Sequence, residues 1–559
     1  MIKKPHSPSE LMGYFINPFE TLMKRYIKLN PSFNITQDPE DVLLKLISQK
    51  GTEHEIKVYK SLVEKYKTSI VIKNEDRNLM VEATKTAMAS GVDLIYQGAL
   101  SDDVFFGLPD FLIKEDGESN FGDYQYRILD AKLAKHIKPE YIIQLSCYSE
   151  LLAYTEGTFN PQAQICLGDQ TYQDINILDF YVYYQKIKQQ FITEMNSVND
   201  ELPSPDNYSQ WGTFSNYAKT FFQNLDHLIQ LPDIRESQIK RFQNSGINTV
   251  EALASTELDH IKGMDYHAFK RLKNQARMHI KTLEAGSLQY EILTDCETGL
   301  GLYSLPPKSR LDVYFDIESN PFHQDMPLHY LWGAGYEDSD KEFKAWWAHS
   351  ESEMESVFES FIDWVYQRRL EDPAMHVFHY GQFEITAIRS LMGLFGTREH
   401  EVDFLLRNNV FIDLLRIVKQ SLCIGGSGYG LKKIEPLYMS DREEELTSGG
   451  DSIVVYEEWR ASPDGLTWQT SEVLKAIRDY NIDDCNSTQE LAQWLRSEQL
   501  SHEINYSSTT EEDDEVKEGE EETEATQLRD KLLNKALAEE DETKQAVLKN
   551  LAWLLEFHK

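Results

Sequence analysis

The chain has 559 residues with a formal net charge of −37, and 41% of the residues are hydrophobic. This length is too great for one hydrophobic core, so we expect three or four folded units of ordinary globular composition. The acidic average excludes a protein that coats nucleic acid with its whole surface, because phosphate contacts require an excess of Lys and Arg.

Membrane segments and cysteine-based sites are both unsupported by the sequence. No run of about 18 apolar residues occurs, and the opening MIKKPHSPSE lacks the apolar stretch of a signal peptide, so we expect a cytoplasmic protein without a membrane partner. The cysteines lie far apart, without a CxxC pair, at Cys147, Cys166, Cys296, Cys423 and Cys485. This spacing predicts neither a disulfide framework nor a zinc or iron-sulfur site.

The first 200 residues mix helical and strand-like patterns. A helix is predicted at 52–66, TEHEIKVYKSLVEKY, and strands at 103–114, 124–133 and 177–184, which read DVFFGLPDFLIK, YQYRILDAKL and ILDFYVYY. We therefore predict an α/β domain over residues 1–205. A polar connector that contains proline, NDELPSPDNYSQWG, follows it.

The ends of two predicted strands carry acidic residues. GLPDFLIK places Gly107 and Asp110 on one strand, and the next strand ends at Asp130. Lys132 lies two residues further and so points to the same side. Carboxylates that hold Mg²⁺ or Mn²⁺, together with one lysine, suit phosphodiester hydrolysis. Taken alone, an Asp-x-Lys on a strand is more often a solvated charge pair.

Three further residues extend this set. His54, in KGTEHE, is a candidate metal ligand. KPEYIIQLSCYSELL is predicted to be a helix that carries Gln144 and Tyr148 on one face, four residues apart, where they can orient the site or touch a nucleic-acid backbone. Each of these residues alone is unremarkable in a helix. The order and spacing of the whole set indicate a site.

The set resembles the PD-(D/E)xK nucleases of the RecB type. The shared pattern is a helix with HE after a glycine, followed by GxxD, DxK and QxxxY. In this sequence the four parts are residues 51–54, 107–110, 130–132 and 144–148. HSPSELMGYFINPFE and AMASGVDLIYQGAL are also similar to RecB-like nucleases that carry a YprB-type ribonuclease-H-like domain. The resemblance implies a restriction-endonuclease-like fold. It also implies the following roles: metal ligands His54, Asp110 and Asp130, and Lys132 assisting the attacking water beside Gln144 and Tyr148.

One feature of these relatives is missing. Many hold an iron-sulfur cluster through a cysteine near the N-terminus and three more after the nuclease core. The corresponding regions here read FINPFE and PSPDNYSQWGTFSN, without cysteine. We therefore expect no iron-sulfur cluster.

A helical module is predicted at 220–290. Its short helical patterns break at NSGINT and IKGMD, and residues 235–281 carry nine Lys or Arg against five Asp or Glu. The segment resembles paired helix-hairpin-helix elements, whose glycine turns, here Gly246 and Gly263, can present backbone N–H groups to phosphates. Asp233 stands where the first hairpin usually has glycine, which argues against phosphate binding there. A helical spacer between two larger units is the alternative.

A second α/β domain is predicted at 305–500, with carboxylates on two strands and a helix. LDVYFDIESNP ends in Asp316 and Glu318 on the same side of a buried strand, an arrangement normally tolerated when a cation neutralises it. HVFHYGQFEITAIRSLM places Glu384 at a strand-to-helix turn, and VLKAIRDYNIDDCNSTQELAQWL places Tyr480 and Asp484 four residues apart on a helix. Four such carboxylates can hold two divalent ions about 3.5–4 Å apart.

This second set resembles the DEDD exonuclease branch of the ribonuclease-H-like fold. Asp316-x-Glu318 corresponds to the first motif, Phe383-Glu384 to the second, and Tyr480 with Asp484 to the third in the tyrosine variant. FIDLLRIVKQS and GYGLKKIE are similar to the YprB-type domain. The resemblance implies metal ligation by the four acids, with Tyr480 facing the attacking water. Glu384 replaces the usual aspartate. The alternative is a ribonuclease-H-like scaffold that binds nucleic acid without cutting it.

The end of the chain is strongly acidic and then amphipathic. Residues 511–524 hold ten acids and one lysine, which predicts a disordered linker over 506–526. One last helix is predicted at 527–559, where the sequence ends in TKQAVLKNLAWLLEFHK. In RecB-like relatives a superfamily 1 helicase often follows, and LAWLLEFHK is similar to its lead-in, which implies a helicase partner in cis or in trans. Alternatively, the helix packs back on the body.

Together the patterns predict a multidomain α/β protein that is a metal-dependent DNA nuclease, acting on single- or double-stranded DNA. The RecB-like domain would be the main cutter and the DEDD-type domain a 3′–5′ trimmer, in DNA repair, end processing or defence. Two alternatives stay open. One is an adaptor that binds nucleic acid without catalysis. The other is an RNA nuclease, since no residue here identifies a reader of the 2′-hydroxyl.

Overall fold

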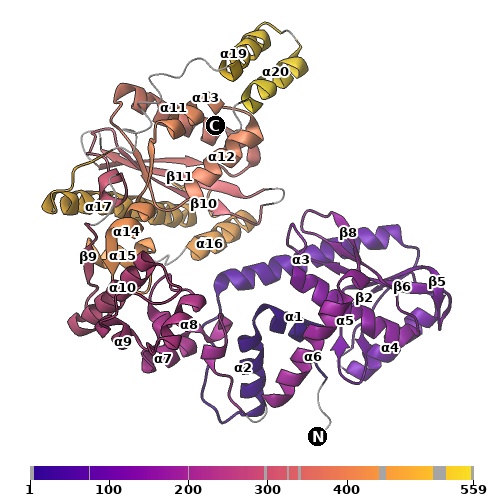
Figure 1. Ribbon diagram of the computed structural model, residues 1–559. Helices are drawn as coiled ribbons and strands as arrows, with labels where there is room; N and C mark the ends of the chain where they lie inside the picture. Colours follow the sequence, from indigo (N-terminus) through magenta and orange to yellow (C-terminus); the bar gives the residue numbers. More distant parts are fainter. Residues whose placement is uncertain are drawn as a thin grey trace.

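The computed structural model consists of three units and a C-terminal helical hairpin (Figure 1). The residues that it describes are 5–74, 76–198, 201–294, 299–323, 326–337, 341–439, 449–507, 524–539 and 541–555. Among these residues, no helix is both long and apolar enough to cross a membrane. Cys296 and most of the predicted acidic linker lie outside the described residues, whereas Cys147, Cys166, Cys423 and Cys485 are buried free thiols.

The N-terminal unit is a six-stranded sheet with helices around it. The strands lie in the order β1-β2-β5-β6-β7-β8, and β6 runs parallel to β7 while β5 and β6 form an antiparallel pair. Its elements are α1 (Pro8–Ile16), α2 (Pro18–Leu29), α3 (Val42–Lys65), β1 (Ser69–Val71), α4 (Arg77–Ala89), β2 (Leu94–Tyr96), β3 (Leu100–Ser101), β4 (Phe106–Gly107), β5 (Phe111–Ser119), β6 (Gly122–Ala131), α5 (Pro139–Glu156), β7 (Gln162–Cys166), β8 (Tyr172–Asn176), η1 (Ile177–Asp179) and α6 (Tyr181–Ser197). The α5 helix provides the crossover that two parallel strands require.

Most of the predicted elements of this unit form as expected. The predicted helix at 52–66 forms the second half of α3, whose buried side chains recur every four residues at His54, Val58 and Leu62. Two predictions are wrong. Residues 177–184 form η1 and the start of α6 instead of a strand, because Tyr184, Phe191 and Met195 bury one helical face. Asp110 is not within a strand but directly precedes β5.

The helical module follows a connector that packs on α2. In the connector, the Phe214 ring lies in a small buried cluster with Phe19 and Met23. The connector and the module contain η2 (Pro205–Asn207), η3 (Gly212–Phe214), α7 (Ser215–Asn224), η4 (Leu228–Gln230), α8 (Glu236–Asn244), α9 (Val250–Ser255) and α10 (Tyr266–Ala285). The turns before α9 and α10 contain Gly246 and Gly263, with φ of 80° and 81°. Glycine adopts this left-handed conformation without steric cost, so it suits both turns.

The C-terminal unit is built on a five-stranded sheet. Its order is β12-β11-β10-β13-β14, with β10, β11 and β12 antiparallel and β10, β13 and β14 parallel. The elements are β9 (Tyr290–Ile292), η5 (Gly301–Ser304), β10 (Val313–Asn320), β11 (Leu328–Glu337), β12 (Lys341–Trp347), α11 (Glu351–Glu371), β13 (Val377–His379), α12 (Phe383–Phe395), α13 (Glu399–Arg407), β14 (Phe411–Asp413), α14 (Leu414–Ser421), β15 (Leu422–Ile424), α15 (Leu431–Ile434), η6 (Glu435–Leu437), α16 (Gly449–Ala461) and α17 (Glu472–Ser501).

Glycines in β11 let α17 lie close to the sheet. A Cβ atom at Gly333 would stand 1.5 Å from the Asn481 Oδ1 atom, so any larger residue there would push the helix away. At Gly335 a Cβ atom would meet the Cys485 Cβ at 3.5 Å, an ordinary contact distance. The close approach brings the middle of α17 against β10, the strand with the predicted acidic pair.

Specific contacts join the three units. Lys50 of α3 pairs with Glu457 of α16 at 2.7 Å, so the N-terminal unit meets the C-terminal unit there. Between the module and the C-terminal unit, Lys419 of α14 pairs with Asp233 at 3.0 Å. Cys423 of β15 and Tyr429 both donate hydrogen bonds to the Gln275 side chain of α10.

The C-terminal segment differs from the prediction of a single helix at 527–559. Two helices, α19 (Glu524–Leu537) and α20 (Glu542–Leu554), pack against each other as a hairpin. Asp541 begins the second helix, because its carboxylate accepts hydrogen bonds from the backbone of Thr543 and Lys544. The hairpin lies at one edge of the molecule (Figure 1).

Candidate functional site

The first site lies where β6 ends, next to the start of β5. Asp130, the penultimate residue of β6, is only 1% exposed. The Ala131 backbone N–H donates a hydrogen bond to Asp110 Oδ2 at 2.8 Å, which fixes the Asp110 side chain against the end of β6. The two acids therefore come together where β6 ends and just before its antiparallel neighbour β5 begins.

The lysine and the helix α5 complete this cluster. The Lys132 ammonium lies 2.6 Å from Asp130 Oδ2 and donates a hydrogen bond to Gln144 Oε1 at 2.8 Å. The Gln144 amide in turn donates to the Tyr148 hydroxyl at 3.3 Å. We use the term first site for Asp110, Asp130, Lys132, Gln144 and Tyr148, all of which the structure brings together.

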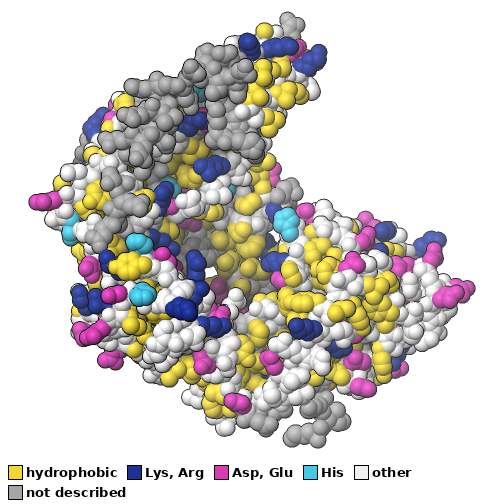
Figure 2. Space-filling view, in the orientation of Figure 1, with side chains coloured by type: hydrophobic (Ala, Val, Ile, Leu, Met, Phe, Trp, Pro, Cys, Tyr) yellow, Lys and Arg dark blue, Asp and Glu magenta, His cyan; other side chains and the backbone are white. Residues whose placement is uncertain are grey.

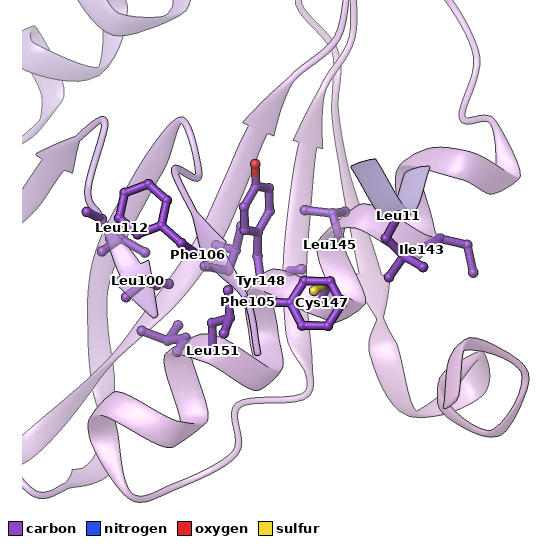
Figure 3. Close-up of a cluster of buried hydrophobic side chains, with 14 of the residues drawn as sticks. Leu11, Leu100, Phe105, Phe106, Leu112, Ile143, Leu145, Cys147, Tyr148 and Leu151 are labelled. Atoms are coloured by element: carbon purple, nitrogen blue, oxygen red, sulfur yellow. The ribbon is translucent and has the colours of Figure 1, made fainter. Parts of the chain in front are cut away.

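Tyr148 joins the first site to the hydrophobic core. Its ring is 3% exposed among side chains such as Phe106 and Leu151, and its hydroxyl points out of that cluster (Figure 3). The hydroxyl donates to the Leu108 backbone carbonyl at 3.1 Å. Because this carbonyl belongs to the loop that ends at Asp110, Tyr148 holds that loop in place.

The charges of the first site favour a bound cation. Burial, followed by the charges of Asp130 and Glu55, raises the pKa of Asp110 well above its ordinary value. Burial opposes the charge of Lys132, but Asp130 and Asp110 outweigh it and raise the pKa of the ammonium. Lys132 thus stays charged, and a divalent ion could take the place of the proton that the raised pKa favours on Asp110.

Glu55, which the sequence analysis did not single out, belongs to this charge cluster, and His54 contacts a neighbouring strand. The His54 imidazole Nε2 lies 3.3 Å from the Cys166 backbone carbonyl at the end of β7. Glu55 accepts a hydrogen bond from the Gln97 amide, and its charge acts on Asp110. Ligation of a metal by His54 remains a prediction. The structure adds Glu55 as a second candidate.

The second site is a compact group of three carboxylates. Among the residues that the structure describes, one group of acidic, histidine or cysteine side chains has its ligand atoms within 4.8 Å of one another, namely Asp316, Glu318 and Asp484. The first two lie on β10 and the third on α17. The predicted strand and helix therefore meet as their acidic residues suggested.

Polar neighbours hold these carboxylates in place. The Asn481 amide donates to Asp316 Oδ2 at 2.6 Å, and the Ser452 hydroxyl donates to Glu318 Oε2 at 2.6 Å. The Tyr330 hydroxyl lies 3.5 Å from the same Glu318 oxygen. Asn481 comes from α17 and Ser452 from α16, and both helices contact β10, so the acids are oriented by the fold.

The donor set fits a divalent metal ion. Burial, then the charges of Glu318, Asp484 and Glu384, raise the pKa of Asp316 well above its ordinary value. Burial raises the pKa of Glu318 to about 7, although the hydrogen bond from Ser452 opposes the rise. Buried acids that repel one another in this way become stable as anions when a hard cation neutralises them.

The other two predicted residues lie beside the triad. Glu384, in the first turn of α12, is buried and contributes to the raised pKa of Asp316, but its Oε2 contacts His379 Nδ1 at 3.5 Å. Tyr480 is 7% exposed, and burial followed by the charge of Asp484 raises its pKa. The phenol therefore keeps its proton and can donate a hydrogen bond.

The hairpin turns of the helical module differ from each other. The positions of a Cβ at Gly246 and at Gly263 are open, with no atom closer than 4.0 Å, so a backbone phosphate can approach these turns. Asp233, in the predicted first hairpin, has a φ of 58° and is paired with Lys419. The absence of phosphate binding at this first turn stays a prediction.

Several supporting residues were missed by the sequence analysis. Asn481 has a signal, since it precedes Asp484 by three residues and so shares its helical face. His379 also has a signal, since it follows Val377 by two residues on β13 and so lies on the same face of that strand. Ser452 has no such signal, because its contact with Glu318 depends on how α16 packs.

Comparison with known families identifies the C-terminal unit. Residues 313–496 match the model of the RNase H superfamily, and this stretch contains all the acidic residues of the second site. The chain therefore includes an RNase H-like domain. No curated protein matches the chain.

Proposed function

We propose that this protein is a metal-dependent DNA nuclease with two cutting sites. The observation that carries the proposal is the triad of Asp316, Glu318 and Asp484, whose ligand atoms lie within 4.8 Å of one another in an RNase H-like domain. The first site supports it independently, because it combines two buried acids with a lysine. In the cell we place this activity in DNA repair, end processing or defence, in the cytoplasm and with a helicase as partner.

At the second site, Asp316, Glu318 and Asp484 would hold Mg²⁺ or Mn²⁺, and Glu384 would approach from α12. A bound divalent ion supplies charge stabilisation and activates water. Tyr480, which keeps its proton, would orient that water through its hydroxyl. Asn481 and Ser452 would keep two of the acids in the orientation that the ion requires. We assign 3′–5′ trimming to this site.

At the first site, Asp110 and Asp130 would hold the ion, with His54 or Glu55 as a further ligand. Lys132 would hold the attacking water or stabilise the charge that develops on the phosphate. Gln144 positions the lysine by accepting its hydrogen bond. We assign the main cutting activity to this site in the manner of RecB-type nucleases.

The proposal is tested by digestion of end-labelled DNA, linear or circular and single- or double-stranded, with Mg²⁺ or Mn²⁺. Asp130→Ala or Lys132→Ala should abolish the main activity. The double variant Asp316→Ala/Glu318→Ala should remove only an activity that requires a free end. Asp123→Ala, which changes an exposed acid on the same strand as Asp130, is the control and should cut like the wild type.

The outcomes separate the alternatives. If neither the first-site nor the second-site variants change DNA degradation, the proposal is wrong. Nucleic-acid binding that resists chelators, without hydrolysis under any metal, would identify an adaptor. A parallel digestion of RNA of the same sequence separates a DNA nuclease from an RNA nuclease.

A further inference from the structure

The short helix α15 carries two exposed lysines next to the second site. Lys432 and Lys433 lie in its first turn, which follows Gly430. The preceding Tyr429 anchors α15, since its hydroxyl donates to the Gln275 side chain of α10 and its backbone carbonyl accepts a hydrogen bond from the Tyr380 hydroxyl. The position of α15 is therefore set by the sheet and by the helical module together.

The two lysines point in different directions. The Lys432 ammonium lies over the Tyr480 ring, 4.5 Å from its centroid. The Lys433 ammonium turns back over its own loop, where it donates to the Ser427 carbonyl at 3.5 Å and would stand 3.1 Å from a Cβ atom at Gly428. Only the first of these two cations is directed at the second site.

A cation beside the second site would reduce the repulsion between its carboxylates and a phosphate backbone. The site gathers several carboxylates, which repel a phosphate backbone wherever a metal ion does not offset them. Lysine binds phosphates as a point charge and needs no fixed geometry. Because the Lys432 ammonium lies over the Tyr480 ring, its charge suits a phosphate that neighbours the one that is cut.

We propose that Lys432 binds a phosphate next to the scissile one and so holds the nucleic-acid strand in the second site. This inference rests on the proposed nuclease function. The strand would run on toward the helical module, where Arg271 of α10 is exposed and its charge acts on Tyr429. Figure 2 shows Lys and Arg side chains along the wall of the central hollow beside this module.

The test compares Lys432→Ala with Lys433→Ala, which removes the same charge one residue away. Binding of a fluorescent single strand is measured by anisotropy over a range of salt concentrations. The full chain also carries Asp130→Asn and Asp316→Asn, so that no cutting takes place. We expect Lys432→Ala to weaken binding about tenfold. The slope of log affinity against log salt should become shallower by about 0.7, the value for one lost phosphate contact.

The controls make the result decisive. Lys433→Ala should change the affinity less than twofold and leave the salt slope unaltered, and Lys432→Arg should restore both. In the Asp130→Asn chain with an intact second site, Lys432→Ala should raise KM with kcat nearly unchanged. Equal salt slopes for the two alanine variants would overturn the inference. Absence of cutting at the second site, with the binding difference intact, would instead refute the proposed function.

Discussion

The substitutions Glu55→Gln and His54→Gln change adjacent residues of α3 and so test which of the two candidates is a metal ligand of the first site. The charge of Glu55 acts on Asp110, whereas His54 contacts a backbone carbonyl. We expect Glu55→Gln to weaken Mn²⁺ binding and DNA cutting at this site. His54→Gln should leave both within about threefold and mainly lower the stability of the fold, by about 1 kcal/mol for one lost hydrogen bond.

The expected loss for Glu55→Gln follows from its charge. Two unit charges about 4 Å apart interact by roughly 4 kcal/mol at the effective dielectric constant of a partly buried site. Water and the remaining amide oxygen recover part of this attraction, so we expect a loss of about 1.4–2.7 kcal/mol. This corresponds to 10- to 100-fold weaker metal binding.

The assay is calorimetric titration with Mn²⁺ together with digestion of linear DNA. Both variants carry Asp316→Asn, which silences the second site, and thermal unfolding reports their stability. The reasoning is refuted if His54→Gln loses metal binding while its fold is intact and Glu55→Gln binds as the parent does. His54 would then be the ligand, as the sequence resemblance implied.

Three further predictions concern protons and packing. Because the pKa of Glu318 is raised to about 7, protons compete with the metal ion for this carboxylate. Mn²⁺ affinity at the second site should therefore increase as the pH rises toward 7 and then level off. An Mn²⁺ affinity that stays constant between pH 5.5 and 8.5 would contradict this. Burial raises the pKa of Glu156 from 4.5 to about 8, so the folded state binds this proton more tightly than the unfolded state, and stability should fall as the pH rises through this window. Glu156→Gln should remove that fall, which is on the order of 4 kcal/mol at most, in denaturant titrations at pH 5 and pH 8.5. Gly333→Ala should lower the melting temperature and the activity of the second site, because its Cβ would displace Asn481 at a cost of about 1–3 kcal/mol. Gly335→Ala is the control and should have a small effect. Equal melting temperatures for the two variants would show that α17 tolerates the shift.

The sequence was most informative where one element has a regular spacing of chemical groups. The strand β10 could be predicted with its acidic pair on one side, because side chains alternate along a strand. The helix α17 could be predicted with Tyr480 and Asp484 on one face. The same holds for Gln144 and Tyr148 on α5, which are hydrogen-bonded to each other in the structure.

The sequence was least informative where the outcome depends on packing between elements. His54 and Glu55 are neighbours on α3, and which of them faces the acids depends on how the helix rotates against the sheet. Residues 177–184 contain aromatic and β-branched side chains that favour strands, but the helix α6 buries Tyr184 and Phe191 together. The approach of Lys432 to Tyr480 joins segments that no local pattern connects.

The ion pair of Lys50 and Glu457 joins the N-terminal unit to the RNase H-like domain at a position close to both sites. Glu457 also accepts a hydrogen bond from Asn320, the last residue of the strand that carries Asp316 and Glu318. Lys50 lies little more than one helical turn before Glu55 on α3. Rotation of one unit against the other would therefore strain α3 beside the first site and β10 beside the second site at the same time.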